Sequence, residues 1–89
     1  MRYITAVHMS TGGTLHEHIA RVKWLDPASS TGEDTTATMV DWIDNKNGVA
    51  KVKSPAGDVS VGTVAGTPRY LRTHADGKWT NNLLALPRF

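Results

Sequence analysis

The chain has 89 residues, of which 39% are hydrophobic, and this suffices for one domain with one modest core. It contains no cysteine, which excludes disulfides, thiolate metal sites and a cysteine nucleophile and fits a reducing cytoplasm. The formal net charge is only +2, no stretch approaches the roughly 20 apolar residues of a membrane span, and the N-terminus lacks the apolar core of a signal peptide. We therefore expect one soluble, cytoplasmic domain over residues 1–89, without a membrane partner and, because its core is small, stabilised as a homo-oligomer.

Two strands joined by a turn are expected first. Residues 2–9 are rich in β-branched and aromatic types, and residues 10–14 contain the turn-forming pair Gly12-Gly13. Residues 16–25 alternate between apolar and polar types, which predicts a second strand hairpinned to the first. Its apolar alternates are Ala20, Val22 and Trp24, and its basic alternates are Arg21 and Lys23.

One helix is expected after a polar connection that begins at Asp26-Pro27. Asp34 or Thr35 is a suitable N-cap, and Asn47-Gly48 is a suitable C-terminal stop. The apolar stripe at helical spacing consists of Ala37, Met39, Val40, Trp42 and Ile43.

Strands return after the helix, at residues 49–53, 58–65, 69–74 and 78–80. Turn signals separate the first two at Ser54 to Gly57 and the last two at Asp76-Gly77. The first strand of this group has Ala50 and Val52 on one side and Lys51 and Lys53 on the other.

The order β-β-α-β-β-β indicates an α+β fold, an antiparallel sheet of about five strands with one helix packed on one face. The apolar tail after Asn81 either closes the core or docks on a neighbouring subunit, since Pro87 prevents a regular terminal helix. For Trp79 we prefer packing against this tail through Leu83 and Leu84, because a small domain needs its aromatic side chains inside. The alternative is an exposed stacking or interface residue.

Charge is distributed unevenly along the chain. The segment 26–44 contains five acids and neither Lys nor Arg, for a local charge of −5, whereas the remainder carries +7. If the helix covers the apolar alternates, the alternates that point away from it are Arg21, Lys23, Lys51, Lys53 and Arg72, with Tyr70 on the same parity. Cations beside an aromatic ring suit phosphates and stacking bases. The alternative is that these side chains only keep the sheet soluble and protect its edges.

His16 and His18 follow the glycine pair. Their spacing on one strand face could chelate Zn²⁺ if His8 or His74 supplied a third ligand, and a metal-dependent enzyme is therefore one alternative. Strand parity instead places both histidines on the side of Trp24, at the rim of the core, where they line one end of a ligand pocket or bond the loop backbone. We expect no metal, no cofactor and no catalytic residue.

Five segments in succession carry a resemblance to a known family: "YITAVHMS", "GG", "HEHIARVKW", "MVDWIDNKNGVA" and "YLRTHADGKWTNNLLALP". Over nearly its whole length the chain resembles small bacterial and prophage proteins catalogued as domain of unknown function 3892. The resemblance implies a family pattern that includes His16 to Ile19, Tyr70 to Thr73 and Asn82 to Leu84. It implies no activity and gives none of these residues a role.

The leading hypothesis is a small non-enzymatic binding protein that holds an anionic ligand, a nucleotide-like molecule or nucleic acid, on the basic sheet face. The candidate ligand-binding residues are Arg21, Lys23, Lys51, Lys53, Tyr70, Arg72, His16 and His18. The alternative from a different class is a phage or prophage inhibitor or adaptor that docks by charge on a host protein, such as a defence protein.

Overall fold

The computed structural model describes residues 1–55, 57–75 and 77–89. Within them lie one α-helix, seven strands and two short 3-10 helices. In chain order the elements are β1 (Arg2–Met9), η1 (His16–His18), β2 (Ile19–Leu25), β3 (Thr31–Thr35), α1 (Thr36–Asn45), β4 (Ala50–Ser54), β5 (Gly57–Val64), β6 (Tyr70–Ala75), β7 (Lys78–Thr80) and η2 (Leu83–Ala85). Two residues of the expected hairpin turns, Ala56 and Asp76, lie outside the described residues.

The described strands form one sheet in the order β3-β2-β1-β4-β5-β6-β7. Neighbouring strands are antiparallel except β1 and β4, which run parallel. The α+β class is therefore confirmed, whereas the expected antiparallel sheet of about five strands is corrected to a mixed sheet of seven. The strand missing from the prediction is β3, which pairs with β2 from Arg21 opposite Thr35 to Leu25 opposite Thr31. As a polar edge strand it lacks the apolar alternation that would have revealed it.

The predicted second strand begins later than expected. Residues 16–18 form the 3-10 helix η1, and β2 starts at Ile19. The ring Nδ1 of His18 accepts hydrogen bonds from the backbone N–H groups of Thr14 and Leu15, both at 3.1 Å. A side chain that takes up backbone donors in this way favours a turn over a ladder. The expected strand position of His16 and His18 was therefore wrong.

The helix is close to the prediction at both ends. The Thr35 hydroxyl accepts the N–H of Thr38 at 3.2 Å, which is the N-cap contact expected there. The N–H of Gly48 reaches back to the Trp42 carbonyl at 2.9 Å, after Asn47 at a positive φ of 55°. Ala37 is exposed and does not belong to the buried stripe, whereas Met39 is fully buried.

The core lies between α1 and one face of the sheet, since α1 contacts β2, β3, β5 and β6. Of the predicted inward alternates, Val22, Ala50, Val52 and Leu71 are buried, whereas Ala20 and Trp24 are half-buried. The other buried apolar side chains are Ile4, Val7, Ile19, Met39, Val61 and Leu83. Among the described residues, no helix has both the length and the apolar character needed to cross a membrane.

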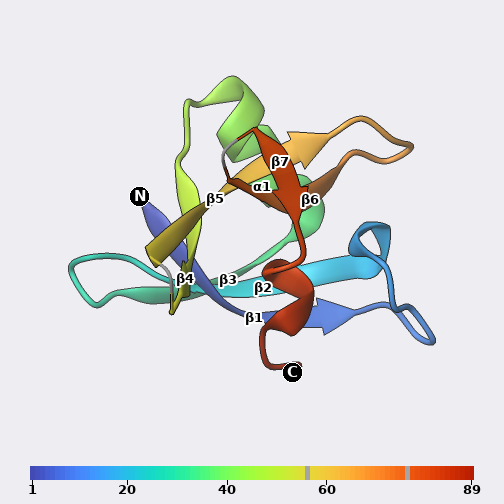
Figure 1. Ribbon diagram of the computed structural model, residues 1–89, viewed down its shortest axis with the longest axis horizontal. Coiled ribbons are helices and arrows are strands. Elements are labelled where there is room, and N and C mark those ends of the chain that lie inside the picture. The colour runs from blue at the N-terminus through green and yellow to red at the C-terminus, as the bar shows by residue number, and fades with distance from the viewer. Residues whose placement is uncertain (56, 76) are drawn as a thin grey trace.

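The C-terminal tail closes a gap in the sheet. Strand β1 pairs with β4 only at Arg2 and Tyr3. Further along β1, the N–H of Val7 donates to the Pro87 carbonyl at 3.0 Å, and the Val7 carbonyl accepts the N–H of Phe89 at 3.2 Å. Figure 1 shows β1 to β3 across the lower part of the molecule, β5 to β7 above them, and the red C-terminal turn reaching down to β1. With Leu83 fully buried, the tail completes the core of its own chain.

Candidate ligand-binding face of the sheet

A continuous row of cross-strand neighbours runs over the half of the sheet formed by β4 to β7. Lys51 lies opposite Ser60, Ser60 opposite His74, and His74 opposite Trp79. Residues that face each other across paired strands point to the same side of a sheet. We call Lys51, Ser60, His74 and Trp79 the Lys51–Trp79 row.

This row faces solvent, because the adjacent row faces the core. The adjacent row consists of Ala50, Val61 and Thr73, each one position along its strand from a member of the Lys51–Trp79 row. Their exposed fractions are 2%, 6% and 0%. Alternation along each strand then directs the Lys51–Trp79 row outward. The predicted parity of Lys51 and Lys53 on β4 therefore agrees with the structure.

The β7 end of the row is aromatic. Trp79 is 48% exposed, and its ring meets that of His74 edge-on, with centroids 5.5 Å apart and planes at 81°. These two rings lie over Gly62, where an ideal Cβ would come within 3.1 Å of His74 and 3.5 Å of Trp79. Together with Gly77 and Lys78 they line a hollow of about 310 Å³. An exposed indole beside a hollow is a surface on which a planar ring could stack.

The expectation that Trp79 packs against the tail was wrong, and strand parity explains why. Thr80 lies opposite the buried Thr73, to which its hydroxyl donates at 2.7 Å, so Thr80 points inward. The preceding residue must then point outward. The tail residues Leu83 and Leu84 pack on the core side instead.

The β4 end of the row is cationic. The Lys53 ammonium lies 4.7 Å from the centroid of the Tyr3 ring, and the Tyr3 hydroxyl donates to Asp58 at 2.8 Å. That hydrogen bond is the main reason why the pKa of Tyr3 is raised, followed by desolvation and the charge of Asp58. Tyr3 is thus held in place beneath the Lys53 ammonium. Tyr3 is also the neighbour of Lys51 in the parallel pair of β1 and β4.

The ion pairs of the described residues lie elsewhere in the fold. They join Arg2 to Asp34, Arg21 to Glu33, Lys46 to Asp41 and Arg69 to Asp44. Each acidic side chain of α1 and β3 therefore forms an ion pair with a basic side chain. Neither Lys51 nor Lys53 forms an ion pair within the described part of the chain, although Asp58 lies opposite Lys53 on the neighbouring strand.

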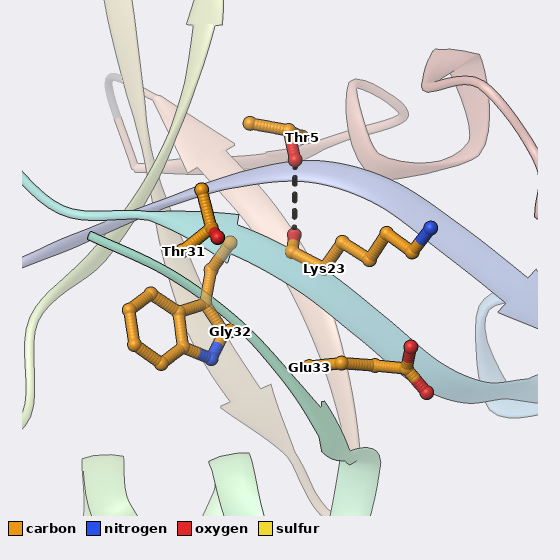
Figure 2. Close-up of a pocket in the computed structure, with 6 residues that line it drawn as sticks. Thr5, Lys23, Thr31, Gly32 and Glu33 are labelled. Carbon is orange, nitrogen blue, oxygen red and sulfur yellow. Dashed lines mark hydrogen bonds between the residues drawn. The ribbon is translucent and has the colours of Figure 1, made fainter. Parts of the chain in front are cut away.

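Arg21 and Lys23 share the outer face of the sheet but lie apart from the Lys51–Trp79 row. The Arg21 guanidinium contacts Glu33 at 2.6 Å, and the Lys23 ammonium lies 4.5 Å above the Phe89 ring. Lys23 and Glu33 also line a hollow of about 460 Å³, and Figure 2 shows their side chains extending in the same direction from neighbouring strands. In this hollow the Glu33 carboxylate forms an ion pair with Arg21, whereas at the β4 end Asp58 lies opposite Lys53 and accepts the Tyr3 hydroxyl without an ion pair to either lysine.

The other predicted site residues occupy two further places. Arg72 donates to the Thr80 carbonyl at 3.2 Å and to the Asn81 side chain at 3.1 Å, which ties it to β7. Tyr70 and His18 line a separate hollow of about 260 Å³, with Arg69 and Glu17. The structure therefore divides the eight predicted residues among different surfaces instead of gathering them in one pocket.

His16 is buried, with 7% of its surface exposed, and its Nε2 has no hydrogen-bond partner among the described residues. Its pKa is lowered, first by burial and then by the nearby charge of Arg72. No cluster of three or more metal-ligating side chains is found in residues 1–55, 57–75 and 77–89. A neutral, enclosed imidazole fits a packing role between η1 and β6, which are in contact.

Sequence reasoning missed His74 and Lys78 as site residues and placed Trp79 inside. A signal was present, because a two-residue hairpin at positions 76 and 77 puts residue 74 opposite residue 79. With Leu71 inward, Thr73 and Thr80 are inward as well, and His74 and Trp79 must be outward.

These features define a small α+β domain in which one helix covers a mixed sheet, and the outer surface of that sheet carries lysines on β4 and an exposed tryptophan on β7. The chain belongs to the family described as Protein of unknown function (DUF3892), whose model matches residues 3–87. No curated protein and no solved structure matches the chain. The resemblance noted from the sequence is thereby confirmed.

Proposed function

We propose that the protein is a non-enzymatic binding protein that holds an anionic ligand with a stackable ring, a nucleotide-like molecule or nucleic acid, on the Lys51–Trp79 row. The observation that carries this proposal is the register that places Lys51 of β4 in one solvent-facing row with the exposed Trp79 of β7, with Lys53 on the same face two residues along β4. Phosphate attracts ammonium groups, and a base stacks on an indole face.

The roles within the row follow from side-chain chemistry. Trp79 would stack on the ring of the ligand, with His74 supporting it edge-on from below. Lys78 at the β7 end would pair with the phosphate of the stacked nucleotide, and Lys51 and Lys53 at the β4 end would pair with phosphates of a ligand long enough to reach them. Relative to the candidates named from the sequence, the proposal keeps Lys51 and Lys53 and adds His74, Lys78 and Trp79.

Binding of nucleotides and short oligonucleotides, followed by fluorescence and by thermal shift at two salt concentrations, tests this proposal. We expect Trp79→Ala to lower affinity at least about fivefold, since stacking on an aromatic side chain is worth roughly 1–3 kcal/mol per base. Trp79 is half exposed, so the variant should retain its fold. Lys46→Ala is the matched control, because Lys46 is an exposed cation on the other side of the fold. Failure of every nucleotide and polyanion to bind, with a single host protein captured at fixed stoichiometry, would favour the inhibitor or adaptor hypothesis instead.

The proposal includes a homo-oligomer. It is supported by the small core and by the position of β3 and β7 at the two ends of the described sheet order, where strand edges are prone to pairing. Light scattering of the full chain over a range of concentrations tests it, and a monomeric mass at all concentrations would remove this part of the proposal.

A further inference from the structure

The row is longer than one nucleotide requires. Three strand-to-strand steps separate Lys51 on β4 from Trp79 on β7. At about 4.8 Å for each step, the two backbones lie about 14 Å apart. A single nucleotide stacked on Trp79 would keep its phosphate at the β7 end, near the hollow that Lys78 lines, and would not span the distance to β4.

The ammonium of Lys53 is held at the far end of this span. It lies over the Tyr3 ring, and Tyr3 belongs to β1, one strand beyond β4 in the sheet order. The Tyr3 hydroxyl is fixed in turn by its hydrogen bond to Asp58. Lys53 therefore points away from Trp79 and cannot serve the phosphate of a nucleotide stacked there.

The middle of the row offers room for a chain to cross. The outward residue of the row on β5 is Ser60, whose small side chain leaves no bulky barrier between the cationic and aromatic ends. Gly62, on the same face of β5, lies beneath the rings of His74 and Trp79. A ligand that joins a ring at β7 to phosphates at β4 can therefore lie flat across β5 and β6. Single-stranded nucleic acid has this repeating order of ring and phosphate, whereas a duplex keeps its bases stacked inside.

We infer that the ligand class is single-stranded nucleic acid, lying across strands β7 to β4, with one base on Trp79 and more distant phosphates at Lys51 and Lys53. This inference rests on the proposed function and narrows it from any nucleotide-like anion to a strand of at least two or three nucleotides. The cations are few, so binding should be modest and sensitive to salt.

A length series tests the inference. The probes are thymidine monophosphate, thymidine oligonucleotides of two to six residues, and a blunt duplex, each titrated into the full-length protein. We expect affinity to rise about tenfold or more between the mononucleotide and the trinucleotide and then to level off, with the duplex bound more weakly. The same series made of RNA shows whether the protein prefers ribose to deoxyribose.

A pair of lysine variants ties the length dependence to the geometry. Lys53→Met keeps the alkyl stem over Tyr3 and removes the charge. It should weaken the trinucleotide severalfold, reduce the magnitude of its log–log salt slope by about 0.7, and leave the mononucleotide unchanged. Lys78→Met should weaken both probes. Lys46→Met should weaken neither.

The outcomes separate the inference from the proposed function. If mononucleotide and trinucleotide bind equally and Lys53→Met affects neither, the ligand is a single nucleotide, and the inference is overturned while the proposed function stands. If the duplex binds as tightly as the single strand, the inference also fails. If no probe binds, both fail. Should Lys53→Met not fold, Lys51→Met supplies the same comparison from the neighbouring position.

Discussion

The guanidinium carbon of Arg2 lies 4.1 Å from the centroid of the Trp24 ring. It also lies 4.3 Å from the centroid of the Trp42 ring of α1, and Asp34 contacts the guanidinium at 3.5 Å. Arg2 faces the core side of the sheet because it lies beside the buried Ala50 in the parallel pair of β1 and β4. A cation in contact with two indoles thus links the first strand to the helix.

Replacing Arg2 should destabilise the fold. Cation–π contacts are worth about 0.5–2 kcal/mol each, depending on desolvation, and Arg2 makes two. We expect Arg2→Ala to lower the free energy of unfolding by about 1–3 kcal/mol in urea titrations. Arg2→Lys should recover only part of this loss, since an ammonium lacks the flat guanidinium face. Lys46→Ala, which breaks an exposed pair with Asp41, should change stability by less than about 0.5 kcal/mol. Equal stability of Arg2→Ala and Lys46→Ala would contradict the assignment.

The close approach of Gly48 to Trp42 gives a second prediction. An ideal Cβ at Gly48 would lie 2.2 Å from the indole Cδ2, a distance that forces the ring or the backbone to move. Trp42 also contacts Arg2. Gly48→Ala should therefore disturb the packing of Trp42 on Gly48 and its contact with Arg2, and lower the unfolding free energy by about 1–3 kcal/mol. Gly12→Ala is the matched control, because Gly12 has a positive φ of 73° but no atom within 4 Å of the added Cβ. It should show only the backbone strain of about 1 kcal/mol. A reversed order of the two variants would be inconsistent with this packing.

The sequence predicted the local features of the fold well. The Thr35 cap, the stop at Asn47-Gly48 and the inward parity of Ala50 and Val52 all rest on neighbouring residues, and each agrees with the structure. Long-range features were not predictable in the same way. The parallel contact of β1 with β4 and the pairing of Val7 with the tail depend on how distant segments meet, and no local pattern encodes that.

For the candidate site, too, local features were predictable from the sequence and long-range contacts were not. Parity on one strand identified Lys51 and Lys53 as outward cations, and the structure agrees. It could not tell that Glu33 on an unrecognised edge strand would pair with Arg21, or that Arg72 would be tied to β7. Parity failed outright at His16, because a side chain that bonds the backbone of its own loop replaced the expected strand with a 3-10 helix.

The lowered pKa of His16 makes stability depend on pH. In the unfolded chain its pKa returns to the ordinary value of about 6.5. Between the lower native pKa and 6.5 the unfolded state binds more protons than the native state, so stability rises with pH through this interval. Above it the neutral ring contributes no further change. The charged groups that act on His16 are Arg72, which disfavours its protonation, and Glu17, which opposes that effect.

Urea unfolding at intervals between pH 5 and pH 8 measures this contribution. We expect His16→Gln, which cannot be protonated, to show a smaller loss of stability on acidification than the parent chain. A nuclear magnetic resonance titration of the His16 ring in the folded protein gives an independent reading. A native pKa at or above 6.5, or parallel stability curves for parent and variant, would refute the proposed linkage.

Thr73 connects β6, β7 and the tail through one buried hydroxyl. Thr73 is fully buried, and its Oγ1 accepts the Thr80 hydroxyl at 2.7 Å and the N–H of Asn82 at 3.1 Å. Thr73→Val has a similar shape but leaves both donors without an acceptor in the interior. The cost should be about 1–3 kcal/mol in unfolding free energy, whereas Thr73→Ser should lose less because it keeps the hydroxyl. Since Asn82 leads into η2, the valine variant should also raise the hydrogen-exchange rates of residues 83–89 relative to those of β4. Unchanged exchange in the tail, or a serine variant less stable than the valine variant, would show that packing rather than this hydroxyl holds the tail in place.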